Sequence, residues 1–195
     1  LGEQRGGQLL SIENNGQRNI SFQLNQEHFT FDPNRMFSTV GIVATLKQLS
    51  KPDPVAVEQV SGFARFVLSH IPDSAIIVAI HNNTDERFSV LSYNMAPLKE
   101  ETAAINITAA HDIDDFILTT DTAVFAFYKN ENSNAILQRE GTLADDGSLS
   151  IFFGKRRRPY INVETQHGHG LQQIALLEKL HRFLNLEKKN FTENQ

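Results

Sequence analysis

Asn34 and Arg35 lie side by side in a segment whose residue types suit the recognition of a carboxylate. A guanidinium group can form a bidentate pair with a carboxylate, and an asparagine amide can donate a further hydrogen bond. Asp32 and Pro33 precede the pair, and the proline favours extended geometry in the residue before it. Asn34 and Arg35 are therefore predicted to lie in a loop and to bind the C-terminal carboxylate of a peptide.

His81 and Glu164 each follow an apolar run that is predicted to form a strand. The runs are Ala75–Ile80 and Tyr160–Val163. Ligands of α/β proteins bind at the carboxyl ends of strands, and an ionisable carboxyl group there is a candidate general base. The alternatives are a histidine that bonds to a backbone carbonyl and a glutamate in a salt bridge at the rim of the sheet.

Three further residues carry weaker predictions. Arg18 lies at the end of a predicted hairpin, where it could polarise a scissile carbonyl group, although either Arg18 or Arg35 could equally anchor a loop. His167 and His169 are two residues apart and could bind a metal ion together with His81. A turn that leads into the following helix is the preferred interpretation of that segment.

The order of these motifs resembles the zinc carboxypeptidase superfamily, including its aspartoacylase and succinylglutamate desuccinylase branch. The similar segments are Asp32-Pro33-Asn34-Arg35, Ile80-His81-Asn82-Asn83 and Asn162-Val163-Glu164-Thr165, and the resemblance runs from about Arg18 to Glu164.

This resemblance implies a role for each candidate residue. Asn34 and Arg35 would hold the substrate carboxylate, His81 would be a zinc ligand, Glu164 would activate water, and Arg18 would contact the oxyanion. The implied function is zinc-dependent hydrolysis of an amide bond beside a free carboxylate, in a peptide or an N-acyl amino acid.

The chain departs from the family pattern at its start. Members of the family carry a metal-binding His-x-x-Glu motif before the Asn-Arg pair. Between Leu1 and Pro33 the only histidine is His28, and Phe31 stands three residues after it. Either the missing ligands lie before Leu1, or the protein is a non-catalytic module that binds carboxylates or peptides, for example in cell-wall material. The absence of an initial methionine favours a processed or truncated chain.

Composition narrows the classes of protein further. The 195 residues suit one domain, and 40% of them are hydrophobic and 21% charged, as in ordinary globular proteins. A net charge of −5 argues against nucleic acid as a partner, and no apolar stretch is long enough to span a membrane. Without cysteine there are no disulfides and no thiolate metal ligands. The compartment is not determined by these features, and a secreted or periplasmic protein is the favoured expectation.

The pattern of apolar residues predicts a single α/β domain over residues 1–195, with a mixed, mostly buried sheet and helices on both faces. The architecture would be zinc carboxypeptidase-like or phosphorylase-hydrolase-like. The predicted helices begin at Asp53-Pro54, at Asp121 and near Leu171, and residues 187–195 are expected to fray. The predicted strands are Gln8–Glu13, Asn19–Leu24, Ala75–Ile80, Phe88–Ser92, Ala135–Gln138, Leu149–Phe153 and Tyr160–Val163.

Overall fold

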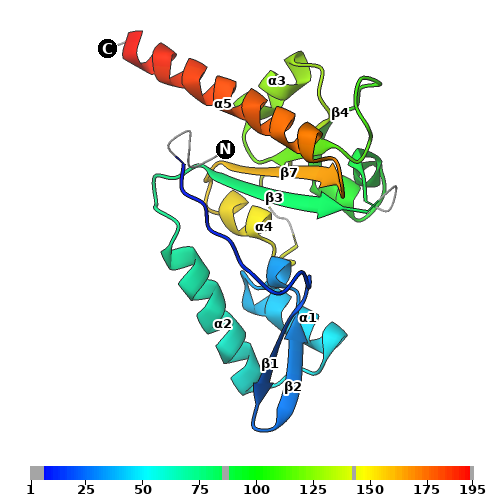
Figure 1. The fold of residues 1–195 in the computed structure, drawn as a ribbon, viewed down its shortest axis with the longest axis vertical. Coiled ribbons are helices and arrows are strands. Elements are labelled where there is room, and N and C mark those ends of the chain that lie inside the picture. Colours follow the sequence, from blue (N-terminus) through cyan, green and yellow to red (C-terminus); the bar gives the residue numbers. More distant parts are fainter. Residues whose placement is uncertain (1–6, 85–87, 142–143, 194–195) are drawn as a thin grey trace. The chain divides into compact units, whose positions relative to one another are not determined.

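The computed structural model describes residues 7–84, 88–141 and 144–193, with side chains to Glu187. These residues form two compact units (Figure 1). The described residues of Ile76–Gly141 and Arg157–Gln195 make up the first, which we call the sheet unit. Those of Gln8–Ala75 and Thr142–Arg156 make up the second, the hairpin unit. The chain therefore leaves the hairpin unit and returns to it once.

The sheet unit is built on a five-stranded mixed sheet of order β3-β7-β5-β6-β4. Strand β7 is parallel to β3 and antiparallel to β5, while β6 is parallel to β5 and antiparallel to β4. The bounds of the strands are Ile77–Asn83 for β3, Thr102–Asn106 for β4, Phe116–Thr119 for β5, Ala135–Gln138 for β6 and Tyr160–Gln166 for β7. The α/β class and the mixed sheet are thus confirmed, and a carboxypeptidase-like architecture stays a prediction, as does a single domain.

Both α-helices of the sheet unit pack on one face of the sheet. Helix α3 spans Thr122–Asn130 and α5 spans Gly170–Glu193. Their buried residues Tyr128 and Leu176 join Ile161 and Val163 of β7 in one apolar core. The hydroxyl of Tyr128 donates to the Leu176 carbonyl at 2.7 Å, which ties α3 to α5. Figure 1 shows α5 lying along β7.

The opposite face carries a short 3-10 helix, η3, at Val90–Asn94, followed by a second, η4, at Leu98–Glu101. The ring of Tyr93 packs edge-on against Phe116 of β5. The strand predicted at Phe88–Ser92 is wrong. The physical reason is a capping box, in which the Ser89 side chain accepts the Leu91 amide and Ser92 accepts the Ser89 amide.

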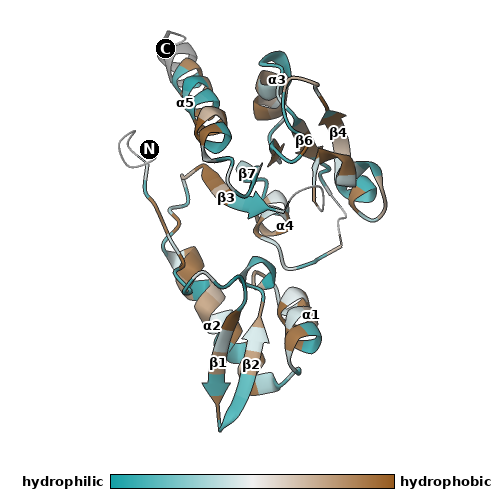
Figure 2. Cartoon of the chain, turned by 45° about the vertical axis from the view of Figure 1, so that its right-hand side comes forward, coloured by the Kyte–Doolittle hydropathy of each residue, from teal (hydrophilic) through white to brown (hydrophobic). Residues whose placement is uncertain are grey.

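Strand β3 lies at the edge of the sheet, and most of its residues are partly buried or exposed. The apolar run Ala75–Ile80 suggested a strand covered on both faces, and this expectation is wrong. Ile80 remains 45% exposed. The strand also extends beyond its predicted end to Asn83, because its last residues pair with Thr165 and Gln166 of β7. Figure 2 shows the resulting change along β3, from hydrophobic residues at its start to hydrophilic ones at its end.

The hairpin unit begins with an antiparallel pair of strands, β1 at Ile20–Leu24 and β2 at Glu27–Phe31. The turn between them is Asn25-Gln26, and both residues have a positive φ, of 49° and 66°. Such a turn matches the twist of a tight hairpin. The predicted hairpin between Gln8–Glu13 and Asn19–Leu24 is therefore wrong. The first segment is exposed and has no strand, because β1 pairs instead with β2 and its buried Phe29 and Phe31.

Three α-helices complete the hairpin unit: α1 at Thr39–Leu49, α2 at Pro54–Ser69 and α4 at Leu149–Gly154. The start of α2 is confirmed, since Asp53 caps it by accepting the amides of Val55 and Ala56. The strand predicted at Leu149–Phe153 is wrong, because Ser148 accepts the Ile151 amide and starts a helix there.

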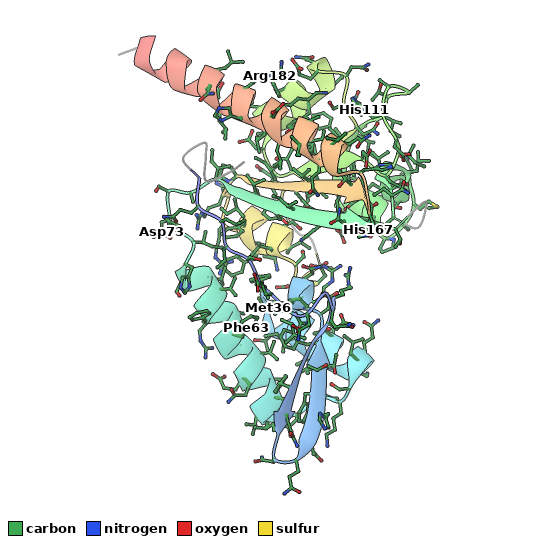
Figure 3. The ribbon with its side chains drawn as sticks, viewed as in Figure 1. Met36, Phe63, Asp73, His111, His167 and Arg182 are labelled. Carbon is green, nitrogen blue, oxygen red and sulfur yellow. The ribbon has the colours of Figure 1, made fainter. Side chains whose placement is uncertain are left out.

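The core of the hairpin unit lies between β2, α1 and α2. Phe29, Phe31, Met36, Ile42 and Leu46 are all nearly inaccessible to solvent. Figure 3 shows the side chains of the molecule and labels Met36 in this core and Phe63 of α2, which packs against it. Met36 directly follows Arg35, so burial of its side chain fixes the end of the candidate carboxylate-binding loop.

In the part of the chain with described residues, no helix combines the length and the apolar character needed to cross a membrane. Fraying was expected from residue 187, but the backbone of helix α5 is helical to Glu193. The expectation is therefore wrong for residues 187–193. Residues 194–195 lie outside the described residues.

Two glycines let the chain approach itself closely in the hairpin unit. A Cβ added to Gly147 would lie 2.6 Å from Gly41 Cα and closer still to the Arg35 carbonyl oxygen. Gly147 also has a φ of +78°. Since Gly16 has a similar φ of +71° but open space around it, it provides a matched control.

We expect Gly147→Ala to lower the free energy of unfolding by about 3 kcal/mol or more, because overpacking adds to the cost of the left-handed backbone. Gly16→Ala should cost about 1 kcal/mol, for the backbone alone. Urea unfolding of both variants measures the difference. Equal losses would show that the close approach at Gly147 is not as tight as described.

Candidate functional site

His81 and Glu164 lie directly opposite each other on the parallel strands β3 and β7. The two atoms Nδ1 of His81 and Oε1 of Glu164 are 3.2 Å apart. The Glu164 side chain is only 8% exposed, whereas that of His81 is 35% exposed. The predicted pair is therefore brought together, with its carboxylate buried and its imidazole partly open to solvent.

Glu164 has two further neighbours on the same face of the sheet. The amide of Asn162 donates to Oε1 at 2.9 Å. On the other side Glu164 is paired in register with the fully buried Phe116 of β5. A buried carboxylate is costly unless it is hydrogen-bonded. The contacts with His81 and Asn162 therefore allow the Glu164 side chain to be buried here. Glu164 lies inside β7 rather than at its end, since the strand continues to Gln166.

Helix α5 is fixed to both strands at this point. The Gln173 amide donates to the His81 carbonyl at 3.2 Å and to the Thr165 hydroxyl at 3.1 Å. This side chain was not singled out from the sequence, where it is one of two adjacent glutamines in a helix. It fixes the backbone of His81 from the helical face.

A second pair of ionisable groups joins the end of β7 to the start of β5. His169 Nδ1 lies 3.0 Å from each carboxylate oxygen of Asp115. The Gln166 backbone amide donates to the same carboxylate at 3.0 Å. Asp115 is 3% exposed, so its charge is held in the interior by these contacts. With Nδ1 turned to Asp115, the other ring nitrogen of His169 is the one available for exchange of a proton.

The hydrogen bond to Asp115 raises the pKa of His169 above its ordinary value. Desolvation opposes this shift, and the negative charges of Asp115, Asp112 and Asp114 add to it. The protonated form of His169 is thus favoured by the fold.

In the hairpin unit, Asp32 organises the loop that carries Asn34 and Arg35. Its Oδ1 accepts the Asn34 amide at 2.9 Å, which caps the 3-10 helix η2 at Pro33–Arg35. Its Oδ2 accepts from Arg18 Nη2 at 2.8 Å. Arg18 therefore anchors Asp32, which is the structural alternative foreseen for it.

Arg35 is held by one of its nitrogens. Nη1 donates to the Asn34 carbonyl at 3.3 Å and lies 3.2 Å from Oδ2 of Asp146. The Arg35 side chain is 44% exposed and that of Asp146 is 35% exposed. Asp146 was not singled out from the sequence, because nothing local indicates that it returns to the loop formed by residues 32–35.

Asp145 forms the next ion pair, with Lys155 Nζ at 2.9 Å. Desolvation is the largest single influence on the pKa of Asp145 and raises it, but hydrogen bonds from Ser38, Lys155 and the Gly147 amide outweigh it and lower the pKa below the ordinary value. The negative charge of Asp145 is thus maintained beside Arg35 and Asp146.

The five predicted site residues fall into two groups. His81 and Glu164 are in contact in the sheet unit, and Arg18, Asn34 and Arg35 surround Asp32 in the hairpin unit. The two groups belong to different units.

A zinc site needs several His, Cys, Asp or Glu side chains that lie close together. Among residues 7–84, 88–141 and 144–187, no group of three or more His, Cys, Asp or Glu side chains is placed to hold a metal ion. His81 and His169 instead make separate contacts, with Glu164 and Asp115. These residues do not fit catalytic zinc, which takes three protein ligands. The metal site suggested for His81, His167 and His169 is not formed by the described residues.

Comparison with family models, curated proteins and solved structures gave no match to this chain. The resemblance to the zinc carboxypeptidase superfamily therefore remains a prediction from three short motifs.

The Asp115–His169 pair makes a prediction about stability and pH. The pKa of His169 is higher in the folded chain than the ordinary value of 6.5 expected when it is unfolded. The pair therefore stabilises the fold fully below about pH 6.5, and this contribution is lost as the pH rises through the folded pKa.

We expect the stability advantage of the wild type over His169→Asn to shrink between pH 6 and pH 9. Urea unfolding at a series of pH values measures it. His167→Asn is the control, because His167 has no carboxylate partner among the described side chains. A difference in the free energy of unfolding between the wild type and His169→Asn that stays constant with pH would contradict the raised pKa of His169.

Proposed function

We propose that this protein binds the carboxylate of a peptide or an N-acyl amino acid through Arg35 and Asn34. The observation that carries the proposal is the way in which Arg35 is held. Its contacts within the described part of the chain use Nη1 alone, so Nε and Nη2 present two parallel N–H donors. This is the arrangement that a bidentate carboxylate needs.

The backbone around Arg35 supports the proposal because it is already fixed. The Arg35 backbone amide donates to the Asp32 carbonyl at 2.9 Å. Two residues later, the Phe37 backbone amide donates to the Gly147 carbonyl at 3.0 Å. A preorganised donor loses less conformational entropy when a ligand binds. The Asn34 side chain lies beside Arg35 and has no hydrogen bond within the described residues, so its amide is available as a further donor.

We expect Arg35→Gln to weaken the binding of N-acetylalanine by about tenfold or more, because a charged partner of the carboxylate is removed. Isothermal calorimetry with purified protein measures this change. Arg65→Gln is the matched control, since Arg65 forms an exposed ion pair with Glu58 in the same unit. N-acetylalanine amide, which has no carboxylate, should not bind. Equal affinity of the wild type and Arg35→Gln would reject the proposal.

A second candidate function is hydrolysis of an amide bond beside a free carboxylate, with Glu164 of the sheet unit as general base. It is favoured by the contact between Glu164 and His81, which places a buried carboxylate beside a partly exposed imidazole. Glu164 would take a proton from water, the resulting hydroxide would attack the carbonyl carbon, and the proton would pass to the departing amine. The resemblance implies zinc, but no step is assigned to it, because the described residues do not form its site.

For this second candidate we expect Glu164→Gln to lower the rate of amide hydrolysis by about 10²- to 10⁴-fold, as the loss of a general base does. Release of free amine from N-acyl amino acids, with added zinc and with a chelator, provides the assay. Glu178→Gln on the exposed side of α5 is the control. Absence of wild-type hydrolysis under both conditions would reject this second candidate.

A further inference from the structure

Three ion pairs occur on the loops that carry and support Arg35 in the hairpin unit. They join Arg18 to Asp32 at 2.8 Å, Arg35 to Asp146 at 3.2 Å, and Lys155 to Asp145 at 2.9 Å. The formal charges of these three pairs cancel. The place proposed to bind a carboxylate is therefore electrically neutral before a ligand arrives.

A ligand whose only charged group is a carboxylate would add one negative charge to this balanced set of ion pairs. When a ligand carboxylate pairs with Nε and Nη2 of Arg35, it shares the guanidinium group with Asp146, which lies at Nη1. Two negative charges then lie close together on one positive group. Like charges brought together at a binding site oppose binding.

Asp146 is not free to move away from this position. Its Oδ1 accepts the Ser148 amide at 2.8 Å, while its Oδ2 faces Arg35. The next residue, Gly147, is in close contact with Gly41 and with the Arg35 carbonyl. The carboxylate of Asp146 and the guanidinium of Arg35 are thus held at a set spacing, and both side chains are exposed by a third or more.

We infer that the end of the ligand that binds here carries a positive charge as well as a carboxylate, so that it is the free end of an amino acid. The ligand carboxylate pairs with Arg35 and its ammonium group pairs with Asp146. The pair between Arg35 and Asp146 is kept, and each of its members gains a partner of opposite charge on the ligand. This inference rests on the proposed binding of a carboxylate by Arg35 and Asn34. It narrows the ligands from carboxylates in general to those with a free ammonium group on the same carbon atom, so that an acyl group is carried elsewhere than on the α-nitrogen.

The two free groups limit the bonds that the ligand can make to other molecules. If the α-amino and α-carboxylate groups of a residue are both free, any amide bond that it makes is formed through its side chain. The ligand is then a free amino acid or an amide formed through a side chain, with Nε-acyl-lysine and γ-glutamyl amides as examples, rather than an ordinary peptide C-terminus.

Three lysine derivatives separate the two charges. Nε-acetyllysine has both the α-ammonium and the α-carboxylate, Nα,Nε-diacetyllysine has only the carboxylate, and Nε-acetyllysine amide has only the ammonium. We expect the wild type to bind Nε-acetyllysine about tenfold or more tightly than either of the others in calorimetry. Equal binding of Nε-acetyllysine and the diacetyl compound would overturn the inference.

Asp146→Asn gives a second test, in which the two ligands respond in opposite directions. Loss of the negative charge should weaken the binding of Nε-acetyllysine, whose ammonium group loses its partner. It should strengthen that of the diacetyl compound, because the negative charge near its carboxylate is gone. Glu58→Gln, from the exposed pair with Arg65, is the control and should change neither. Tighter binding of both ligands by Asp146→Asn would also overturn the inference.

These outcomes are distinct from failure of the proposed function. If the diacetyl compound binds as well as Nε-acetyllysine and both depend on Arg35, carboxylate binding stands and the requirement for an ammonium group falls. If neither ligand binds, or if Arg35→Gln has no effect on either, both proposals fall. The comparison of ligands on the wild type decides the question even if Asp146→Asn does not fold.

Discussion

Strand β7 is the element on which the chemistry of the sheet unit depends. Its parallel register with β3 places Glu164 opposite His81, and its antiparallel register with β5 places the same residue opposite Phe116. A shift of one residue in either pairing would turn Glu164 to the face covered by α3 and α5. The backbone amide of Gln166, at the end of this strand, also binds the Asp115 carboxylate. One strand thus positions two buried carboxylates, each beside a histidine.

The hairpin unit relies on a different constraint, which is close backbone contact rather than strand register. Gly41 near the start of α1 and Gly147 in the loop before α4 allow these two segments, which are distant in sequence, to approach closely at the Arg35 carbonyl. This contact holds Asp146 near Arg35. The same geometry that fixes the arginine also supplies its counter-ion, so a group of each charge is held at this loop.

Local sequence patterns predicted some elements well and others poorly. The cap at Asp53 and the strand Ala135–Gln138 were predictable, because their signals lie within a few residues. The short apolar run Leu149–Phe153 was not, since its length suits either a strand or a turn of helix. Among site residues, His81 and Glu164 were found from their places after apolar runs. Their direct pairing could not be predicted, because it depends on register between segments that are 83 residues apart.

The division of the chain has a consequence for the order in which the protein is made. Arg35 emerges from the ribosome early, but Asp146 follows only after strands β3 to β6 have been synthesised. The ion pair between them closes a long loop, and such contacts form late and slowly compared with local ones. During synthesis the arginine is therefore without its counter-ion until the chain returns to the hairpin unit. The pairing of Arg35 with Asp146 is a product of completed folding, and it is absent from the nascent chain.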